Sequence, residues 1–320
     1  MSAGTDAGVE FCGLRLAHPI INGSGTFDAI AARRAFGEQL RARFPFAAYV
    51  SKTITLAPRA GNPPPRLWEA PAGLINSIGL PNKGLDGYLR EDLPQLAAIG
   101  IGAAGDADND AHAGAAADTD DGERRVPLIT NVMGASAEEL AQLLEACDAR
   151  SEIAALELNV SCPNVKTGLD IGADPRQLEQ VVSAVRARTS KPMIVKLTPN
   201  TADVAACALA AEQGGADAVS LINTLRAMAL APGAGGAWLG GGSGGLSGPA
   251  IRAVALAQVA AVAARVSIPV IGMGGVQRAA HARDLLNVGA TLVAVGSESF
   301  RDPAVAAKIA RELSDATLDS

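Results

Sequence analysis

Eight short apolar runs recur along this chain of 320 residues, and most are separated by stretches with the spacing of an amphipathic helix. The runs cover residues 19–22, 47–52, 127–132, 154–160, 192–197, 218–223, 269–272 and 291–295, and the clearest helical stretches cover residues 137–149, 175–189, 202–213 and 249–265. Apolar strands that alternate with helices are typical of a parallel sheet buried on both faces. Eight such units predict a single (β/α)8 barrel, the TIM barrel fold, over residues 1–320.

Polar or glycine residues stand where the predicted strands end. They are Asn22, Gly23, Ser24, Lys52, Asn131, Asn159, Lys196, Asn223, Gly274, Gly275, Gly296 and Ser297. In a barrel the carboxyl ends of all strands meet at one rim, where catalytic residues lie. An open doubly wound sheet would instead spread these residues along a crevice. The length permits one barrel or two ordinary domains, and the count of eight favours the barrel.

Charge and composition exclude several classes of function. The chain has 27 basic and 33 acidic residues, a net charge of −6, and its lysines form no basic stripe that would follow a nucleic-acid backbone. Its amino terminus lacks the features of a secretion signal, and no run of 18 apolar residues is present. The four cysteines form no CxxC pair and the three histidines form no ligand pattern. We therefore expect a cytoplasmic protein that binds no metal, nucleic acid or membrane.

Two stretches lack a helix or strand pattern. Residues 99–125 are small and acidic with no apolar period, which predicts a flexible insertion between the second helix and the third strand. That position is on the amino-terminal face, away from the predicted site.

The glycine-rich residues 233–248 follow the sixth strand and belong to the carboxyl rim, a position suited to ordering over a ligand. They contain GxGxxG at residues 240–245, but no predicted strand leads into it and no helix starts directly from it, so this is no dinucleotide site.

Cys162 differs from the other cysteines in its surroundings. It stands in the string L-E-L-N-V-S-C-P-N-V-K at residues 156–166, where the neighbouring serine, proline and asparagine favour a turn that exposes side chains. An accessible thiol at the end of a barrel strand can serve as a base or a nucleophile. The other three cysteines lie among apolar or helical residues, which predicts packing roles for Cys12, Cys147 and Cys207.

Two glycine-containing strings at the predicted rim indicate a bound phosphate. They are G-M-G-G-V at residues 272–276 and V-G-S at residues 295–297, after the seventh and eighth strands. Glycines let the backbone approach an anion closely, and barrels commonly bind phosphate there. Lys52 and Lys196 end the second and fifth strands, where a buried ammonium needs an anionic partner or solvent. A flavin is one such partner, because a lysine beside its pyrimidine ring stabilises the negative charge gained with a hydride.

Asparagines are frequent at the predicted strand ends and in nearby loops. Each amide both donates and accepts hydrogen bonds, which suits a flat substrate rich in amide groups. A single loop asparagine commonly stabilises a turn, but local structure does not account well for several at successive strand ends. The set comprises Asn76, Asn131, Asn159, Asn164 and Asn223. From the residues alone we expect a site for a flat polar ring and an anionic cofactor, with a cysteine base or nucleophile.

Several strings resemble those of the dihydroorotate dehydrogenases, in particular the class 1B catalytic subunit, over nearly the whole chain apart from the acidic insertion. They are I-N-G-S-G-T-F at residues 21–27, S-K-T-I-T at 51–55, G-N-P-P-P-R at 61–66, N-S-I-G-L-P-N at 76–82, N-V-S-C-P-N-V-K-T-G at 159–168, V-K-L-T-P-N at 195–200, I-N-T at 222–224 and G-G-L-S-G-P-A-I at 244–251. The resemblance implies FMN-dependent oxidation of (S)-dihydroorotate to orotate in de novo pyrimidine (UMP) biosynthesis. The chain departs from the family pattern at the insertion, at residues 26–28 and at Ala227.

The resemblance also implies roles for residues at matching positions. Cys162 would be the base that removes the C5 proton while a hydride leaves C6 for the flavin, although a thiol with a pKa of about 8.5 needs assistance from its site. The implied FMN contacts are Ser24, Lys52, Thr53, Asn131, Asn159, Lys196, Ile222, Gly248, Gly274, Gly275, Gly296 and Ser297. The implied substrate contacts are Lys52, Asn76, Ser77, Ile78, Gly79, Leu80, Asn159, Asn223 and Thr224. Lys52 and Asn159 belong to both sets, because the substrate must stack on the flavin.

The class determines the electron acceptor. Class 1B implies transfer to NAD through a second subunit with FAD and a 2Fe-2S cluster, in an assembly of two catalytic and two electron-transfer chains. Class 2 enzymes have serine at the position of Cys162, whereas class 1A enzymes share the cysteine and use fumarate. The alternatives are therefore a class 1A-type enzyme, another flavin barrel such as a dihydropyrimidine dehydrogenase domain or a tRNA dihydrouridine synthase, and a barrel that binds flavin or pyrimidine without turnover. The acidic balance disfavours an RNA substrate.

Overall fold

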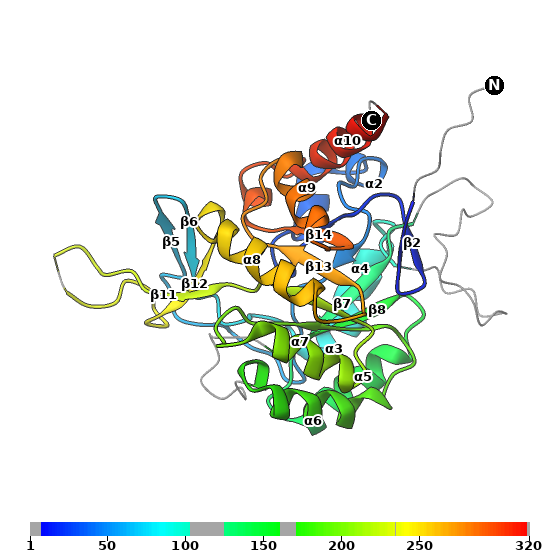
Figure 1. The fold of residues 1–320 in the computed structure, drawn as a ribbon, viewed down its shortest axis with the longest axis horizontal. Helices are drawn as coiled ribbons and strands as arrows, with labels where there is room; N and C mark the ends of the chain where they lie inside the picture. The colour runs from blue at the N-terminus through cyan, green and yellow to red at the C-terminus, as the bar shows by residue number, and fades with distance from the viewer. Residues whose placement is uncertain (1–7, 103–124, 161–170, 234, 319–320) are drawn as a thin grey trace.

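The computed structural model describes residues 8–102, 125–160, 171–233 and 235–318, with side chains as far as residue 315. Its centre is a sheet of eight parallel strands in the order β3-β14-β13-β10-β9-β8-β7-β4 (Figure 1). The strands are β3 (Ile20–Asn22), β4 (Tyr49–Val50), β7 (Leu128–Val132), β8 (Ala155–Asn159), β9 (Met193–Lys196), β10 (Ala218–Leu221), β13 (Val270–Met273) and β14 (Leu292–Val295). Each lies within or overlaps one of the eight predicted runs, and the prediction of a (β/α)8 barrel is confirmed.

Strands β3 and β4 close the barrel through a main-chain bond and a side chain. The amide of Ala47 donates to the carbonyl of Ile20 over 2.9 Å. The Asn22 side chain continues the ladder, because its Nδ2 donates to the Val50 carbonyl and its Oδ1 accepts from the Val50 amide, both at 2.8 Å. Asn22 is fully buried, so its amide pairs backbone groups that solvent does not reach. This asparagine therefore contributes to the closure of the barrel.

Helices surround the barrel, and several begin at side-chain caps. The Ser136 hydroxyl accepts from the Glu139 amide at 3.3 Å, and the Asp203 carboxylate accepts from the Ala206 amide at 2.9 Å. The α-helices are α1 (Ala29–Phe36), α2 (Gln39–Ala42), α3 (Gly84–Gly87), α4 (Leu93–Ala97), α5 (Ala137–Asp148), α6 (Pro175–Arg186), α7 (Val204–Gln213), α8 (Arg252–Ala263), α9 (Ala279–Asn287) and α10 (Val305–Leu318). One π-helical segment, η1 (Tyr88–Asp92), and three 3-10 helical segments complete the described helices: η2 (Ile171–Ala173), η3 (Pro249–Ile251) and η4 (Ser297–Phe300). The four predicted helical stretches are thus confirmed, the last as η3 followed by α8.

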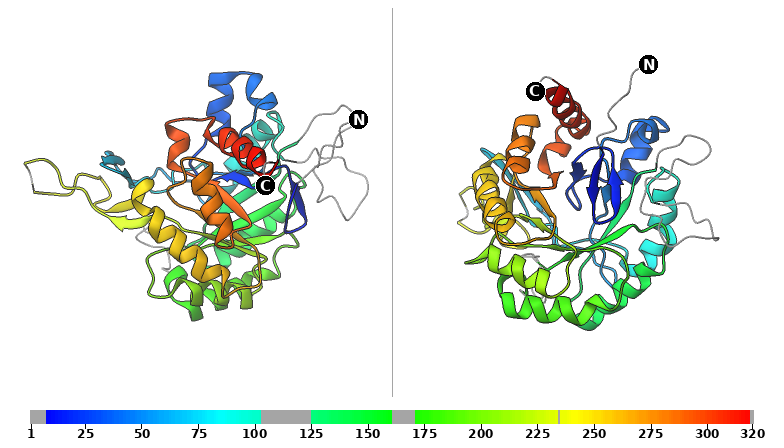
Figure 2. Two further views of the ribbon diagram at one scale, coloured as in Figure 1. Left: turned by 45° about the horizontal axis from the view of Figure 1, so that its top comes forward. Right: turned by 45° about the vertical axis from the view of Figure 1, so that its right-hand side comes forward.

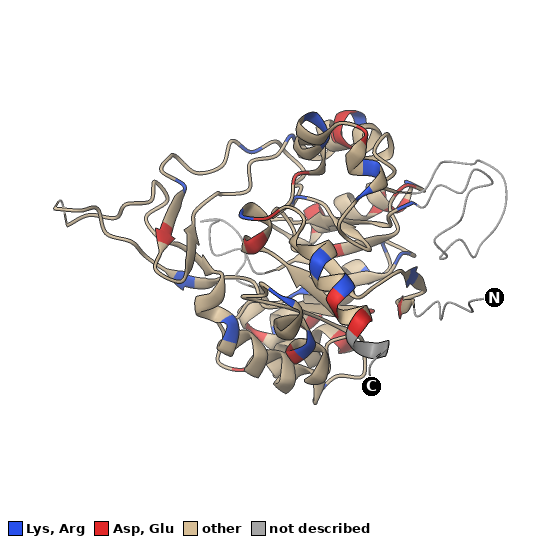
Figure 3. Ribbon diagram, turned by 90° about the horizontal axis from the view of Figure 1, so that it is seen from above, with Lys and Arg blue, Asp and Glu red and all other residues tan. Residues whose placement is uncertain are grey.

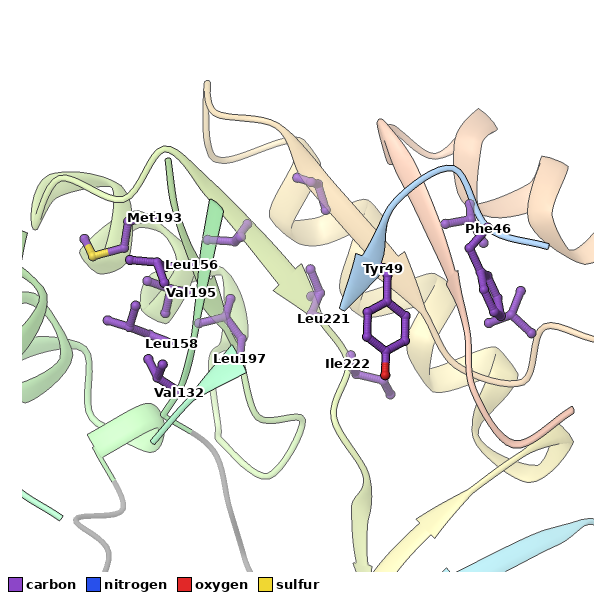
Figure 4. Packing of buried hydrophobic residues seen from close by; sticks show 14 of the residues in the cluster. Phe46, Tyr49, Val132, Leu156, Leu158, Met193, Val195, Leu197, Leu221 and Ile222 are labelled. Carbon is purple, nitrogen blue, oxygen red and sulfur yellow. The ribbon is translucent and has the colours of Figure 1, made fainter. Parts of the chain in front are cut away.

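The barrel strands separate two apolar regions. The larger region lies between strands and helices and contains Leu156 and Leu158 of β8 (Figure 4). The smaller region fills the amino-terminal half of the barrel interior and contains Ala155 and Ile194. Successive side chains of a strand point to opposite faces, so every second residue of β8 faces the interior. Farther along the strands the inward positions become polar, and this change marks the transition from the core to the site.

A hairpin covers the amino-terminal end of the barrel. Strands β1 (Val9–Phe11) and β2 (Leu14–Leu16) pair antiparallel. Phe11, Leu14 and Leu16 are buried in the same cluster as the inward apolar residues of the barrel. In the right-hand view of Figure 2 this dark blue hairpin lies within the ring of helices. The sequence analysis did not predict the hairpin, because strands of three residues are too short to display an alternating pattern.

A second, antiparallel sheet projects from the carboxyl side of the barrel and has the order β11-β12-β6-β5 (Figure 1). Its strands are β5 (Leu67–Ala70), β6 (Gly73–Asn76), β11 (Leu225–Ala227) and β12 (Gly244–Ser247). The Trp68 and Trp238 rings pack edge to face with centroids 5.3 Å apart. Glycine is required at residue 73, where β6 pairs with β12, because a Cβ on Gly73 would lie 2.0 Å from the Ser247 carbonyl oxygen. No charged residue occurs between Ala227 and Ile251, and the described part of this stretch is drawn without blue or red in Figure 3.

The described ends of the predicted insertion lie before β7, on the amino-terminal face. Ile99 and Ile101 are buried in the main core, so the described chain remains part of the barrel as far as residue 102. These two isoleucines anchor the chain, and the Gly102 amide donates to the Val126 carbonyl at 2.8 Å. Residues 103–124 lie outside the described residues. Within the described part of the chain, no helix is both long and apolar enough to cross a membrane.

Candidate functional site

A cavity of about 410 Å³ opens at the carboxyl end of the barrel. Residues at the ends of every barrel strand except β7 contribute to its walls, and the second sheet adds residues from β5, β6 and β12. The predicted convergence of strand ends on one rim is therefore observed for the segments that follow these strands. Residues far apart in the sequence, such as Ser24, Asn159 and Ser297, line the same space.

Most of the residues predicted to contact ligands lie around this cavity. From the predicted cofactor set, the cavity is lined by Ser24, Lys52, Thr53, Asn159, Lys196, Ile222, Gly248, Gly274, Gly275, Gly296 and Ser297. From the predicted substrate set, it is also lined by Asn76, Ile78, Leu80, Asn223 and Thr224. The two sets share one continuous space, which is the arrangement that a substrate stacked on a cofactor requires.

Asn131, Ser77 and Gly79 do not line the cavity. Asn131 is fully buried in β7, and Val132 continues the strand beyond it. Ser77 is also fully buried, and its hydroxyl accepts from Nδ2 of Asn62 at 3.0 Å. Gly79 has a φ of +74°, and a Cβ there would lie 2.4 Å from the Asn62 amide nitrogen. Ser77 and Gly79 thus shape the loop that presents its neighbouring residues to the cavity.

Cys162 and Asn164 lie outside the described residues. The described stretch before them ends at Val160, beside the cavity. Asn159 lines the cavity, and its Nδ2 donates to the Thr53 hydroxyl at 3.4 Å. The described chain resumes next to the same point, since the Gly172 amide donates to the Val160 carbonyl at 3.1 Å. Val160 and Gly172, which lie on either side of the undescribed residues, are therefore both at the carboxyl end of β8.

None of the three described cysteines lines the cavity. Cys147 and Cys207 are fully buried in the main core, which confirms their predicted packing roles. Burial raises the pKa of the Cys147 thiol to about 12 and also raises that of Cys207. Cys12 is half-buried in the hairpin at the other end of the barrel, where burial and then the charge of Asp217 raise its pKa to about 12. Thiols with such pKa values remain protonated at neutral pH, which makes them poor bases.

Glycines at the cavity wall leave main chain exposed to a ligand where a side chain would not fit. Gly274 and Gly275 follow β13 with φ angles of +136° and +67°, and Gly248 has a φ of +89°. A Cβ on Gly275 would lie 2.7 Å from Cβ of Arg252. In the same cavity, the Ser297 hydroxyl donates to the Ser247 hydroxyl at 2.7 Å. Glycine main chain and serine hydroxyls that line a cavity together fit a phosphate group.

The described lining has an excess of positive charge. Lys52 is exposed and Lys196 is only 6% exposed, and both line the cavity. Glu298 is the one acidic residue among the described lining residues, and its Oε2 accepts from Nε2 of Gln277 at 2.9 Å. Two ammonium groups against one carboxylate fit an anionic ligand. The buried amides, exposed glycine backbone and lysines therefore fit a flavin with its phosphate.

The sequence analysis missed several lining residues. Leu67 and Leu74 come from the second sheet, and Phe300 follows the predicted phosphate string. Leu67 and Phe300 are largely exposed at the cavity. None of them carries a chemical signal in the sequence, because an isolated leucine or phenylalanine in a loop resembles any other apolar residue. Only the three-dimensional structure shows that these residues line the cavity.

The fold and the site define a (β/α)8 barrel with a ligand cavity at the carboxyl ends of its strands. The dihydroorotate dehydrogenase family model matches residues 7–317, so the chain belongs to this family. Among its relatives is a protein of Citrifermentans bemidjiense, 39% identical over 98% of this chain and 94% of that protein. Others come from Geotalea daltonii, 40% identical over 97% and 92%, and Trichlorobacter lovleyi, 41% identical over 94% and 90%. All three are named dihydroorotate dehydrogenase B (NAD(+)), catalytic subunit, and the resemblance found in the sequence is confirmed.

Proposed function

We propose that this chain oxidises (S)-dihydroorotate to orotate in de novo UMP biosynthesis. The observation that carries the proposal is the cavity, where lysines, amides and exposed glycine backbone meet at the carboxyl rim of a barrel from the dihydroorotate dehydrogenase family. The relatives carry the name of this activity. A flat substrate with amide groups and an anionic cofactor match the polar groups that line the cavity.

FMN is the proposed flavin. Its phosphate is assigned to the wall formed by Gly248, Gly274, Gly275, Gly296 and Ser297, all of which line the cavity. Lys196 is the buried cation assigned to the flavin ring, together with Thr53 and Asn159. Bound there, FMN supplies the acceptor for the hydride that leaves C6 of the substrate. A buried ammonium beside the ring favours the charge that the ring gains.

The substrate is assigned to the neighbouring part of the cavity, beside the second sheet. Asn76 is held there because its Nδ2 donates to the Gly245 carbonyl at 3.2 Å, and Asn223 is held because its Oδ1 accepts from the Thr224 amide at 2.9 Å. Amides fixed in this way select a ligand by its pattern of donors and acceptors. Lys52 is the cation available on this side for the substrate carboxylate.

Cys162 is the proposed base. The described cysteines are unsuited to the role, because burial raises the pKa of each of them. The Sγ of Cys162 would accept the C5 proton of dihydroorotate, which leaves the carbon framework ready for loss of the hydride from C6. A thiol with an ordinary pKa of about 8.5 is mostly protonated at pH 7, so the site must favour the thiolate or assist the transfer.

A separate subunit is the proposed destination of the electrons. The relatives are named as catalytic subunits of NAD(+)-linked enzymes, a name that implies a partner chain. We assign to that partner FAD and a 2Fe-2S cluster, with NAD as final acceptor, in an assembly of two catalytic and two electron-transfer chains. Among the described residues, no group of three or more His, Cys, Asp and Glu side chains could hold a metal.

The substitution Cys162→Ala tests the proposed chemistry. The variant is expected to bind FMN as the unmodified protein does but to lose dihydroorotate oxidation by roughly a hundred-fold or more, since general base catalysis contributes factors of this size. The matched control is Cys147→Ala, which removes a buried thiol that does not line the cavity and should leave the rate nearly unchanged. Stopped-flow reduction of bound FMN by dihydroorotate measures both. Equal rates for the two variants would refute the assigned role of Cys162.

A further inference from the structure

Glu157 is an acidic residue inside the barrel with no role in the site described so far. It lies in β8, two residues before Asn159, and is 2% exposed. Its Oε1 accepts from the Ser220 hydroxyl of β10 at 2.7 Å, and its Oε2 accepts from Nδ2 of Asn131 in β7. A buried carboxylate is costly, and two hydrogen bonds offset only part of that cost. Its position beneath the cavity points to a function for the site above it.

The carboxylate fixes the orientation of the Asn131 side chain. An ionised carboxylate only accepts hydrogen bonds, so the end of the amide that faces Glu157 must be the donating Nδ2. The acceptor Oδ1 is then turned away from Glu157. This oxygen is buried and has no hydrogen-bond partner among the described residues. An unpaired buried acceptor is destabilising by itself, and a bound ligand that donates a hydrogen bond would satisfy it.

The remaining polar groups of Asn131 are already engaged. Its main-chain amide donates to the Ser51 hydroxyl at 3.0 Å, and its carbonyl accepts from the Ile54 amide at 2.9 Å. Between these two partners in the sequence lie Lys52 and Thr53, which line the cavity. The Oδ1 therefore belongs to a residue that is bonded on both sides of a cavity-lining segment, and the resemblance already implied that this residue contacts the flavin.

We propose that Glu157 is a positioning residue, which orients the Asn131 amide so that Oδ1 accepts a hydrogen bond from the ring N–H of the bound flavin. The inference rests on the proposed function, because it takes flavin as the ligand. Ser220 does not set the orientation of the Asn131 amide, because in this network its hydroxyl bonds only to Glu157. A hydroxyl both donates and accepts, so it could not select one end of the amide in any case. The negative charge of Glu157 also faces the interior that contains Lys196, the other buried charge among the described residues.

The test exchanges donor and acceptor between the two side chains without changing their size. Asn131→Asp places two buried carboxylates together, and flavin affinity is expected to fall by roughly ten-fold or more at pH 8. In the double variant Glu157→Gln with Asn131→Asp, the new amide donates to the new carboxylate, whose second oxygen remains an acceptor at the position of Oδ1. Its flavin affinity is expected to return to within about three-fold of the unmodified protein. Fluorescence titration of flavin-free protein with FMN measures affinity, and thermal unfolding without flavin measures the fold.

The double variant preserves the charge of the pair, so its affinity reports which end of residue 131 faces the ligand. If it binds FMN as weakly as Asn131→Asp although its unfolding temperature has recovered, the inference is wrong. Ser220→Ala is the matched control, because it removes the other bond to Glu157 and is expected to change FMN affinity by less than about two-fold. A ten-fold loss in that control would also overturn the inference. If the unmodified protein binds no FMN, the proposed function itself fails.

Discussion

At the scale of single residues, the two charged side chains buried in the described part of the chain have opposite signs and lie on neighbouring strands. Lys196 ends β9 and is 6% exposed, and Glu157 lies in β8 and is 2% exposed. Lys196 lines the cavity, whereas Glu157 lies beneath it. Burial of a charge is expensive unless an opposite charge or a ligand compensates it. We infer that the buried ammonium is retained for an anionic or electron-accepting ligand.

Replacing Lys196 with Met tests this inference. Methionine retains much of the side-chain length but removes the charge, so FMN affinity is expected to fall by roughly ten-fold, the effect of losing a charge-assisted contact. Fluorescence titration with FMN measures the change. The matched control is Lys191→Met, because Lys191 lies just before the amino end of the same strand, away from the cavity. An equal loss of affinity in both variants would contradict a specific role for Lys196.

The sequence identified most of the cavity-lining residues, because a polar residue is conspicuous where an apolar run ends. The sequence could not distinguish Asn131 from Asn159, because both asparagines stand near the end of an apolar run. Asn159 ends β8, whereas β7 continues through Val132 and keeps Asn131 inside the barrel. Glu157 was overlooked because one acidic residue within an apolar run resembles an outward-facing position. Only the register of the strands distinguishes these cases.

At the scale of secondary structure, the barrel was predictable and the second sheet was not. The barrel strands are buried on both faces, so each gives a continuous apolar run that the sequence displays directly. Strands β6 and β12 contain Gly73, Gly244 and Gly245. Neighbouring main chain lies too close for a Cβ at Gly73 and Gly244, and the Thr224 side chain does so at Gly245. The same glycines remove the β-branched and aromatic pattern by which strands are recognised. Close packing thus hides this sheet from sequence analysis.

Asp148 connects the end of α5 to the loop before β9. Its Oδ1 accepts from the Thr189 hydroxyl at 2.6 Å, the Ser190 amide at 2.8 Å and the Lys191 amide at 3.3 Å. Burial raises the pKa of this carboxyl, but the hydrogen bonds together lower it by more, so the net shift is downward from 3.8. A lowered pKa in the folded state means that the ionised carboxylate stabilises the fold.

The substitution Asp148→Asn is therefore expected to lower the free energy of unfolding by about 1–2 kcal/mol at pH 7. The contribution of the carboxylate is present above the pKa of the unfolded chain and is lost as the pH falls through the lower pKa of the folded state. The two proteins should thus converge in stability as the pH falls through the lowered pKa of the folded-state carboxyl. Urea unfolding from pH 7 down to about pH 2 measures this. A difference that stays constant over the whole range would show that the charge is irrelevant.

At the scale of the whole molecule, the two ends of the barrel carry different structural features. The cavity and the second sheet lie at the carboxyl end, and the β1–β2 hairpin covers the amino-terminal end (Figures 1 and 2). The ends of the acidic insertion also lie on the amino-terminal side, where Gly102 and Val126 are hydrogen-bonded to each other. In barrels of this class, the carboxyl end performs the chemistry and the other end contributes stability.

Replacing residues 103–124 with a short Gly-Ser linker should therefore leave the site intact. The paired ends at Gly102 and Val126 are already close, so a short linker can join them without strain. FMN affinity and the rate of flavin reduction are expected to change by less than about two-fold, since the cavity lies at the opposite end. The same titration and stopped-flow assays measure both. A large loss of FMN binding in a variant with normal unfolding would assign the insertion a part in the site.

The central claim is that this barrel holds a flavin that dihydroorotate reduces. The most direct measurement is the visible spectrum of the purified chain, loaded with FMN under anaerobic conditions, before and after addition of dihydroorotate. We predict that the oxidised-flavin band bleaches on addition of the substrate, and that it persists in the Cys162→Ala variant. An oxidised band that persists in the unmodified protein, or a chain that stays colourless after incubation with FMN, would contradict the account.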